Sequence, residues 1–265
     1  MAIITISKGS FSGGEALAER LSETLEYRLL AREQLLTRTA DAFGASRHQL
    51  ESALIQKPGF LEGRGLRRLH YIHCVQATMA RAAKDDNLVY HGEAGHLLLT
   101  GIPHHMRVRV VAAPEARIAA ARAHADLTRD KAIAYIAVLD EKRDLWLRWV
   151  YGVDTNDPDT YDLVINFERI PPESATQLIV ELVRRDFRTT PDSQKLMDDF
   201  ALVSEIRAKI GLDPHVSDER IRVAADDGVV TLSAHVRVLH SMERVRELVG
   251  TIPGVKTVRT EEIHE

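Results

Sequence analysis

Residues 3–17 read IITISKGSFSGGEAL, and this stretch decides the expected fold class. A short β-branched run leads into a loop with three glycines, and leucines then repeat at every fourth position, Leu17, Leu21 and Leu25, as on one face of a helix. A strand, a glycine loop and a helix in this order are typical of phosphate-binding loops, because the N–H groups at a helix N-terminus face an anion. The stretch therefore predicts an anion-binding loop between a strand and a helix.

The end of this loop lacks the groups that phosphoryl transfer needs. The transfer motif has a lysine that reaches the terminal phosphates, followed by a Ser or Thr hydroxyl that holds Mg²⁺. Here the helix opens with Gly14, Glu15 and Ala16, so a carboxylate and a methyl group stand at those positions. Lys8 or Ser12 could stand in for the missing groups. The alternative is that the acid only complements the helix dipole and the glycines only turn the chain.

Composition and charge exclude several classes of protein. A chain of 265 residues with 45% hydrophobic and 28% charged residues is typical of a globular protein of one or two domains. A net charge of -4 gives no reason to expect a nucleic-acid partner. The single Cys74 cannot form an internal disulfide, and no segment is long and apolar enough for a signal-peptide core or a membrane span. We therefore expect a cytoplasmic protein.

Strands and helices alternate along the first 187 residues. We expect strands at residues 2–6, 88–90, 106–112 and 161–167, and helices at 17–25, 32–43, 66–83, 114–125, 128–150 and 173–185. Such alternation predicts an α/β domain with a parallel sheet covered by helices on both faces. A polar stretch at residues 188–195 is expected to be a linker.

The tail, residues 196–265, has the pattern of a small α/β domain. Helices are expected at 196–210 and 240–249, and strands at 221–224, 229–236 and 256–263. Asp227 and Gly228 lie between two alternating strands, which is a strong hairpin signal.

Two parts of the first domain resemble the cytidylate-kinase-like family of nucleoside monophosphate kinases. The segments ITIS, SGGEALAERLSETLEY and AREQLL, within residues 3–36, are similar to the family's opening, and DEKRDLWLRWVYGV and YDLVIN, within residues 140–167, to its lid and final strand. The resemblance covers residues 1–185. It implies a P-loop kinase fold with a lid, and a reaction that moves the γ-phosphoryl group of ATP to a nucleoside monophosphate with Mg²⁺.

The resemblance also implies site residues. The candidate nucleotide or phosphate ligands are Gly9, Ser12, Gly13, Gly14, Arg32, Asp140 and Arg143, and the catalytic residues of an active enzyme would be Arg143 and Lys8. Arginine suits such roles because its planar fork pairs with phosphate oxygens. The alternatives are a surface salt bridge for Arg32 and a solvated helix face for Arg143.

Three positions depart from the family pattern in one direction. Glu15 replaces a basic residue, Ala31 replaces an acid before the arginine, and Glu93 replaces an arginine. An unpaired like charge beside a polyphosphate is costly in a partly desolvated site. The leading hypothesis is therefore a degenerate, pseudokinase-like domain that binds a nucleotide or another phosphorylated small molecule. An active kinase using ATP and Mg²⁺, and a scaffold that binds neither, are the alternatives.

The tail resembles a BON domain. VAADDGVVTLSAHV, residues 223–236, and TIPGVKTVRTEEI, residues 251–263, are similar to that family's hairpin and its glycine-valine ending. The resemblance implies a sensor or interaction module that contacts protein or lipid and is not catalytic. No metal site is predicted, because the histidines lack metal-ligand spacing. Trp146 and Trp149 lie on one expected helix and suit a core or a subunit interface, so a homo-oligomer is a further expectation.

Overall fold

The computed structural model describes residues 1–55, 65–213, 216, 221–235 and 239–263. The chain forms two compact units. The first unit comprises Met1–Leu35, Leu54–Lys57 and Asp85–Thr190, and the second comprises Leu36–Ala53, Pro58–Lys84 and Pro191–Glu265.

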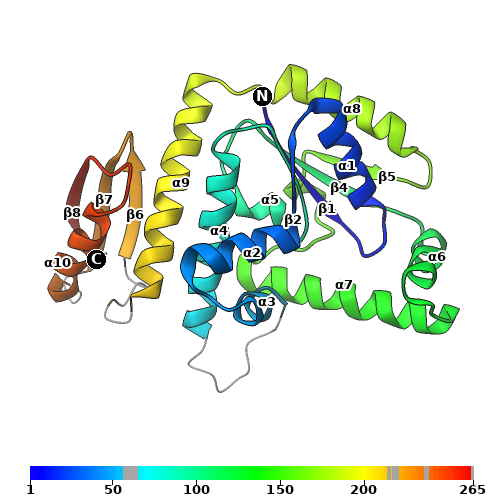
Figure 1. Ribbon diagram of the computed structural model, residues 1–265, viewed down its shortest axis with the longest axis horizontal. Coiled ribbons are helices and arrows are strands. Elements are labelled where there is room, and N and C mark those ends of the chain that lie inside the picture. The colour runs from blue at the N-terminus through cyan, green and yellow to red at the C-terminus, as the bar shows by residue number, and fades with distance from the viewer. Residues whose placement is uncertain (56–64, 214–215, 217–220, 236–238, 264–265) are drawn as a thin grey trace. The chain divides into compact units, whose positions relative to one another are not determined.

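A five-stranded parallel sheet forms the centre of the first unit (Figure 1). Its strands are β1 Ile3–Lys8, β2 Arg28–Ala31, β3 Leu88–His91, β4 His105–Val111 and β5 Leu163–Asn166. They lie in the order β2-β3-β1-β4-β5, and every neighbouring pair is parallel. β1 is therefore the middle strand, and the loop that follows it lies at the edge of the sheet where parallel strands end, which is where open α/β sheets bind ligands.

Helices cover both faces of this sheet. The helices are α1 Gly14–Leu25, α5 Gly95–Leu98, α6 Pro114–Ala125, α7 Arg129–Tyr151 and α8 Pro172–Asp186, with the short 3₁₀ helix η1 Pro158–Thr160 before β5. Ile4 and Ile6 of β1 pack with apolar side chains of α1 and α8 in one buried cluster. Thr5 and Ser7 alternate to the other face and reach His105 and His96. The predicted parallel sheet with two covered faces is confirmed.

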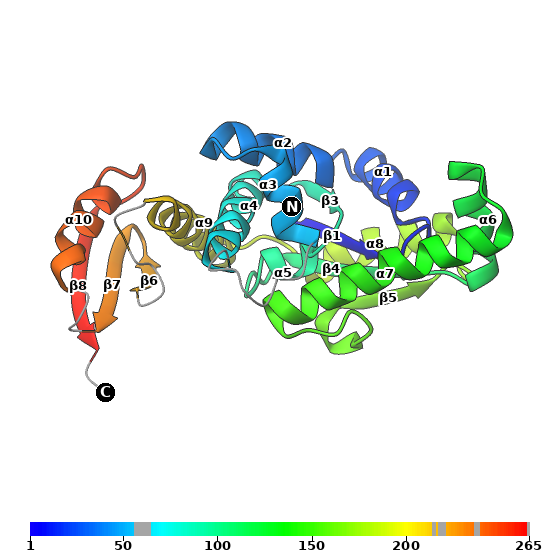
Figure 2. The ribbon, with the colours of Figure 1, turned by 90° about the horizontal axis from the view of Figure 1, so that it is seen from below.

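The second unit contains helices and a smaller sheet. α2 Arg32–Phe43 begins in the first unit and ends in the second, and most of α3 Arg47–Ile55 belongs to the second unit. α4 Gly65–Ala83, α9 Pro191–Leu212 and α10 Leu239–Gly250 lie wholly in it. The strands β6 Ile221–Asp226, β7 Val229–His235 and β8 Thr257–Ile263 form a sheet in that order, antiparallel and then parallel (Figure 2). Ile206 and Ile210 of α9 belong to the same buried cluster as Val230 and Leu232 of β7.

Several elements differ from the sequence-based expectation. β2, α3 and α5 were not expected; β2 and α5 have only four residues each, too few for a periodic pattern to register. α9 begins at Pro191, inside the stretch expected to be a linker, and proline is well tolerated in a first helical turn. The hairpin prediction is confirmed: Asp227 and Gly228 both have positive φ, as a tight two-residue turn between right-twisted strands requires.

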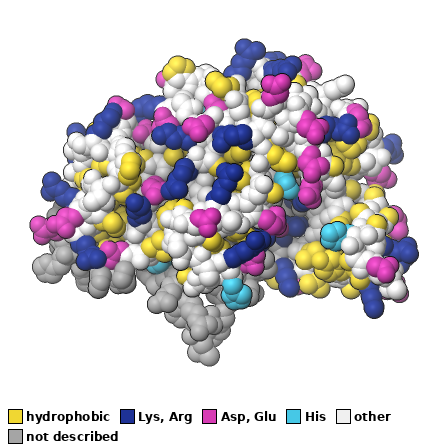
Figure 3. All heavy atoms as spheres, viewed as in Figure 1, with side chains coloured by type: hydrophobic (Ala, Val, Ile, Leu, Met, Phe, Trp, Pro, Cys, Tyr) yellow, Lys and Arg dark blue, Asp and Glu magenta, His cyan; other side chains and the backbone are white. Residues whose placement is uncertain are grey.

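Surface charges of both signs are interspersed on the face that Figure 3 shows. Hydrophobic side chains gather on the same face over α7. Among the described residues, none of the helices is both long and apolar enough to cross a membrane.

Candidate functional site

The loop between β1 and α1 uses its glycines for close packing. Gly13 has φ 84°, a left-handed conformation that favours glycine. A Cβ atom on Gly14 would lie 2.9 Å from Cβ of Lys8, so only glycine lets the helix start this close to the strand. At Gly9 a Cβ atom would lie 3.5 Å from Cζ of Arg117, which is an ordinary van der Waals contact, so this position does not require glycine. Gly13 and Gly14 therefore shape the loop whether or not it holds an anion.

The hydroxyl of Ser12 forms hydrogen bonds within the protein. Ser12 is 2% exposed. Its Oγ lies 2.9 Å from the carbonyl oxygen of Gly9 and 3.2 Å from that of Val110, and it donates to these backbone acceptors. The hydroxyl thus fastens the loop to β4 and does not point toward a ligand.

Lys8, the other candidate substitute, is paired with the acid at the helix start. Its Nζ lies 3.4 Å from Oε2 of Glu15. The two side chains carry opposite charges and lie next to each other beside the loop. Lys8 therefore adds little net positive charge for a phosphate there.

Asp140 of α7 contacts the loop directly. Its Oδ1 accepts a hydrogen bond from the backbone N–H of Ser10 at 3.1 Å and lies 3.2 Å from Nη1 of Arg143. Its Oδ2 accepts a hydrogen bond from Arg117, whose Nε also donates to the carbonyl of Ser10 at 2.7 Å. Burial raises the pKa of Asp140, but the hydrogen bonds from Arg117 and Ser10 outweigh it and hold that pKa below its usual value. An ionised carboxylate therefore takes a loop N–H of the kind that would otherwise bind a phosphate.

Glu93 lies between the two candidate arginines, Arg32 and Arg143, and forms an ion pair with each. Its Oε2 lies 2.6 Å from Nε of Arg32, in ionic contact although the N–H is not directed along a hydrogen bond, and its Oε1 lies 3.8 Å from Nη2 of Arg143. Arg32 also lies 3.5 Å from the carboxylate of Glu33. Arg143 in turn donates to Oγ of Ser10 at 3.3 Å.

The structure thus brings Arg32, Asp140 and Arg143 into one ion-pair network beside the loop. We call this set of side chains the loop network; its members are Ser10, Arg32, Glu93, Arg117, Asp140 and Arg143. Arg117 and Ser10 were not candidates from the sequence. Arg117 lies on α6 outside every segment that carries the family resemblance, so no motif pointed to it. Glu93 was noted as a departure, but its bridging of two arginines follows only from the fold.

Two buried histidines, His96 and His105, form hydrogen bonds with side chains of β1. Nδ1 of His96 lies 2.7 Å from Oγ of Ser7. Nδ1 of His105 donates to the carbonyl of Leu99 at 2.9 Å, which leaves Nε2 to accept from the hydroxyl of Thr5 at 2.7 Å. Burial lowers the pKa of His96 to about 3 and that of His105 to about 4. Both are neutral at pH 7 and serve as hydrogen-bonding parts of the sheet core.

A cavity of about 20 Å³ lies at the carboxyl ends of the strands. It has room for about one water molecule. Lys8, Glu93, His96 and Arg143 are among the residues that line it. Side chains from the end of β1, from the turn after β3, from α5 and from α7 therefore meet around this cavity.

The residues at the helix start do not fit Mg²⁺ and ATP in the manner of the transfer motif. Ala16 offers no oxygen, Glu15 is a carboxylate at the phosphate position, and the hydroxyl of Ser12 donates to backbone carbonyls. Across the part of the chain that the structure describes, no three His, Cys, Asp or Glu side chains form a group that could hold a metal ion.

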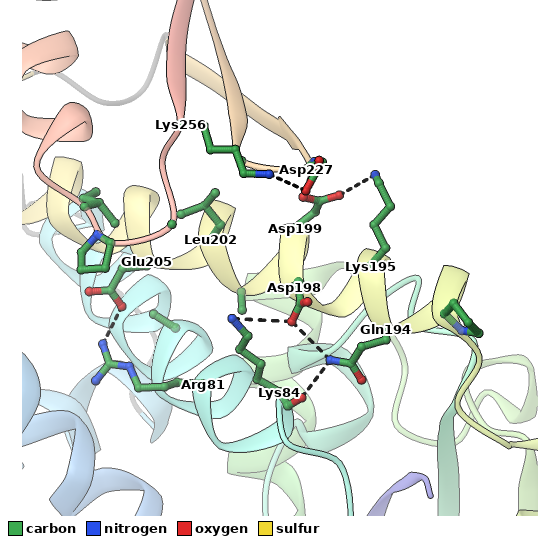
Figure 4. A pocket seen from close by; sticks show the side chains of 17 residues that line it. Arg81, Lys84, Gln194, Lys195, Asp198, Asp199, Leu202, Glu205, Asp227 and Lys256 are labelled. Carbon is green, nitrogen blue, oxygen red and sulfur yellow. Dashed lines mark hydrogen bonds and ion pairs between the residues drawn. The ribbon is translucent and has the colours of Figure 1, made fainter.

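A larger cavity, of about 670 Å³, lies in the second unit (Figure 4). Side chains of α4 and α9 line it together with the turns at Gly228 and Gly254. The charged side chains around it form ion pairs: Arg81 with Glu205 at 2.6 Å, Lys84 with Asp198 at 3.6 Å, Lys195 with Asp199 at 2.9 Å and Lys256 with Asp227 at 2.9 Å. The wall of this cavity is therefore close to neutral, with apolar side chains such as Leu202 and Ile252 between the pairs.

The parallel sheet, the glycine loop after its middle strand and the arginines of α7 define a domain of the P-loop kinase type. Residues 3–169 match the cytidylate kinase-like family, which is more than half of the chain. The chain therefore belongs to the cytidylate kinase-like family. Residues 198–264 match the BON domain, in agreement with the small sheet and its hairpin.

Two solved structures are similar to this chain, and the first of them supports the fold alone. An uncharacterized protein from Eubacterium ventriosum ATCC 27560 is 17% identical, with a TM-score of 0.53 over 70% of this chain and 99% of its own. A shikimate kinase from Bacteroides thetaiotaomicron is 14% identical, with a TM-score of 0.44 over 69% of this chain and 98% of its own. Curated protein sequences gave no match.

Proposed function

We propose that the kinase-like domain binds a phosphorylated small molecule without transferring its phosphoryl group, and that the protein has a regulatory role. The observation that carries this proposal is the loop network, in which the chain's own carboxylates Glu93 and Asp140 pair with the arginines that a phosphate would need. The strand, the glycine loop and the arginines of a phosphate site are present, while carboxylates of the same chain neutralise the arginines.

The absence of transfer chemistry is supported by the helix start. Phosphoryl transfer depends on positioning and on stabilising the charge of the transferred group. Glu15 and Ala16 replace the lysine and the hydroxyl that would do this, and Lys8 is paired with Glu15. Each missing group supplies a large part of the catalysis in working enzymes of this type.

Retained binding is supported by the geometry of the arginines. Arg117 and Arg143 both point at the loop and contact Ser10 as well as Asp140. A phosphate dianion carries more charge and more acceptor oxygens than a carboxylate, so it can compete for the same donors. Because it must displace Asp140 or Glu93, we expect weak binding.

A thermal-shift titration tests the binding. The probes are inorganic phosphate, CMP and ATP, each with and without Mg²⁺, and at least one should raise the melting temperature in a concentration-dependent way. Arg143→Ala should abolish the rise. Arg148→Ala is the matched control, since Arg148 lies on the same helix but pairs with Asp144 and Asp154. If no probe raises the melting temperature, the domain is a scaffold and the proposal fails.

An active nucleoside monophosphate kinase is the second candidate. One observation favours it: Lys8 and Arg143 line the same small cavity at the strand ends, so two cations lie close to one point of the site. A coupled assay with ATP, Mg²⁺ and each nucleoside monophosphate distinguishes the two candidates.

We assign an interaction role to the BON domain. Its support is the family match and the cavity that its two turns help to line. Co-sedimentation of the full chain with vesicles of phosphatidylglycerol or of phosphatidylcholine tests for a lipid contact. Binding to neither favours a protein contact.

A further inference from the structure

The cavity of about 670 Å³ in the second unit has the size of a small-molecule site (Figure 4). Pockets for such ligands commonly measure about 300–1,000 Å³. Hydrogen bonds within the protein fix its walls. Oδ1 of Asp199 accepts from the backbone N–H of Asp227 at 2.9 Å, which joins α9 to the hairpin turn. Nε2 of Gln194 donates to the carbonyl of Lys84 at 2.9 Å, which joins α9 to α4. The cavity therefore does not depend on a ligand for its shape.

The charges that line the cavity cancel. Four are cations and four are acids, and each cation lies 3.6 Å or less from an acid. A ligand with a net charge takes one of these groups from its partner and leaves the partner unpaired, whereas a zwitterion offers a charge of each sign. Apolar side chains lie among the ion pairs, including Ala77, Leu202 and Ile252. The lining therefore suits a ligand with two opposite charges on an apolar body.

Asp198 of α9 offers an unused acceptor. Its Oδ1 accepts a hydrogen bond from Nε2 of Gln194 at 3.2 Å and lies 3.6 Å from Nζ of Lys84, too far for a good hydrogen bond. Among the described residues, none donates a hydrogen bond to its Oδ2. The side chain of Asp198 is 46% exposed. An ammonium group can therefore bind here while the hydrogen bond from Gln194 is kept.

Arg81 of α4 offers unused donors. Within the described part of the chain, its guanidinium donates only to Glu205, through Nη2 at 2.6 Å. A guanidinium has five N–H groups in a planar fork, and a carboxylate can pair with two of them side by side. The side chain of Arg81 is 55% exposed. A ligand carboxylate can therefore bind Arg81 while Glu205 keeps its ion pair.

The separation of these two groups sets the length of the ligand. Asp198, Leu202 and Glu205 follow one another on α9 at intervals of four and three residues, so they lie on one face of the helix. Seven residues of an α-helix span about 10 Å. Since Arg81 pairs with Glu205, its guanidinium lies about two helical turns from Asp198, with the apolar Leu202 between them. An extended peptide of about three residues covers this distance.

We propose that this cavity binds a short zwitterionic peptide of about three residues, with its ammonium group at Asp198, its carboxylate at Arg81 and an apolar side chain on Leu202. The residues that line the cavity belong to the second unit, and none of them belongs to the loop network. The proposal therefore does not depend on a phosphorylated ligand, and either proposal can fail without the other.

Calorimetric titration of the full chain with the tripeptide Ala-Leu-Ala tests the proposal. The free tripeptide should bind. Its N-acetylated form, which lacks the ammonium group, and its C-amidated form, which lacks the carboxylate, should each bind at least about tenfold more weakly. Free leucine should lose a similar factor, because its two charges lie too close together to reach both Asp198 and Arg81. Equal binding of any of these three probes, or no binding of Ala-Leu-Ala at millimolar concentration, overturns the proposal.

Two variants test the assigned contacts. Asp198→Asn should bind the free and the acetylated tripeptide with similar affinity, because the charge that selects the ammonium group is gone. Arg81→Met should bind the free tripeptide at least about tenfold more weakly than wild type.

Arg244→Met is the matched control for Arg81→Met. Arg244 also pairs with an acid, Asp213 at 3.0 Å, and is exposed to a similar extent, 53%, but it is not among the described residues that line the cavity. This variant should leave binding unchanged. Equal affinity in Arg81→Met and Arg244→Met, or an unchanged preference of Asp198→Asn for the free tripeptide, contradicts the assigned contacts.

Discussion

The carboxylate of Asp140 accepts a hydrogen bond from the backbone N–H of Ser10 at 3.1 Å, although the two residues lie 130 positions apart. The contact joins helix α7 to the loop that follows the middle strand of the sheet. It places an internal anion at a loop whose N–H groups and nearby arginines are suited to an external one. Under the proposed function, an incoming phosphate has to compete with a carboxylate of the chain itself.

Removing the charge of Asp140 should open the site to phosphate. In Asp140→Asn the guanidinium groups of Arg117 and Arg143 lose their shared partner, so inorganic phosphate should bind several-fold more tightly. Stability should fall by about 1 kcal/mol, since a partly exposed charged hydrogen-bond network is broken. Calorimetric titration with phosphate and thermal unfolding measure the two effects.

Asp144→Asn provides the control for this variant. Asp144 lies on the same helix but accepts from Thr155 and pairs with Arg148, away from the loop. It should leave phosphate binding unchanged. Equal phosphate affinity in wild type, Asp140→Asn and Asp144→Asn contradicts a competing role for Asp140.

The free energy of unfolding should depend on pH through the buried histidines His96 and His105. Their pKa values are about 3 for His96 and about 4 for His105 in the folded chain, against about 6.5 in the unfolded chain. Between these values the unfolded state binds more protons, so stability is complete above pH 6.5 and falls as the pH decreases. We expect a loss of about 2 kcal/mol per histidine between pH 7 and pH 5.

Denaturant unfolding at pH 7, 6 and 5 measures this slope. His96→Gln should reduce it, since one titrating group is removed, while His105 and His91, whose pKa burial also lowers, keep part of the slope. His48→Gln, at an exposed position of α3, should leave it unchanged. A slope that is the same in wild type and His96→Gln would refute the assignment.

The hairpin of the BON domain should depend on Gly228. Its φ is 78°, and a Cβ atom there would lie 2.7 Å from the carbonyl oxygen of Gly254. Gly228→Ala should therefore destabilise the domain by about 2 to 3 kcal/mol, through backbone strain and overlap together.

Gly250→Ala makes the same change where the structure leaves room. No atom lies within 4 Å of the added methyl group, and the residue ends helix α10. The variant should be neutral or more stable by up to about 1 kcal/mol. Differential scanning calorimetry compares both variants with wild type, and an unchanged transition in Gly228→Ala would contradict the strained turn.

The fold was predictable where the chain repeats a long pattern. The alternation of apolar strands with amphipathic helices predicted the parallel sheet, and the Asp227–Gly228 signal predicted the hairpin, because both are local properties of the sequence. β2 and α5 were missed since four residues carry no periodicity. α3 was missed because its apolar residues, such as Leu50 and Ala53, form too short a stripe.

The site was predictable only in part, for a different reason. The glycine loop, Arg32, Asp140 and Arg143 stood out through their resemblance to a family pattern. The roles of Arg117 and Glu93 depend on contacts between residues far apart in the chain, namely Arg117 with Asp140 and Glu93 with Arg32. Such pairings are set by the packing of α6, α7 and β3, which no local pattern of residues specifies.

If the loop network surrounds a phosphate site that does not transfer phosphoryl groups, the protein should lack kinase activity. The decisive measurement is a coupled kinase assay of the full chain with ATP, Mg²⁺ and each nucleoside monophosphate. We expect no turnover above the background, in wild type and in Arg143→Ala alike. Turnover by the wild-type chain that disappears in Arg143→Ala and persists in Arg148→Ala would show that the site is catalytic and overturn the proposed function.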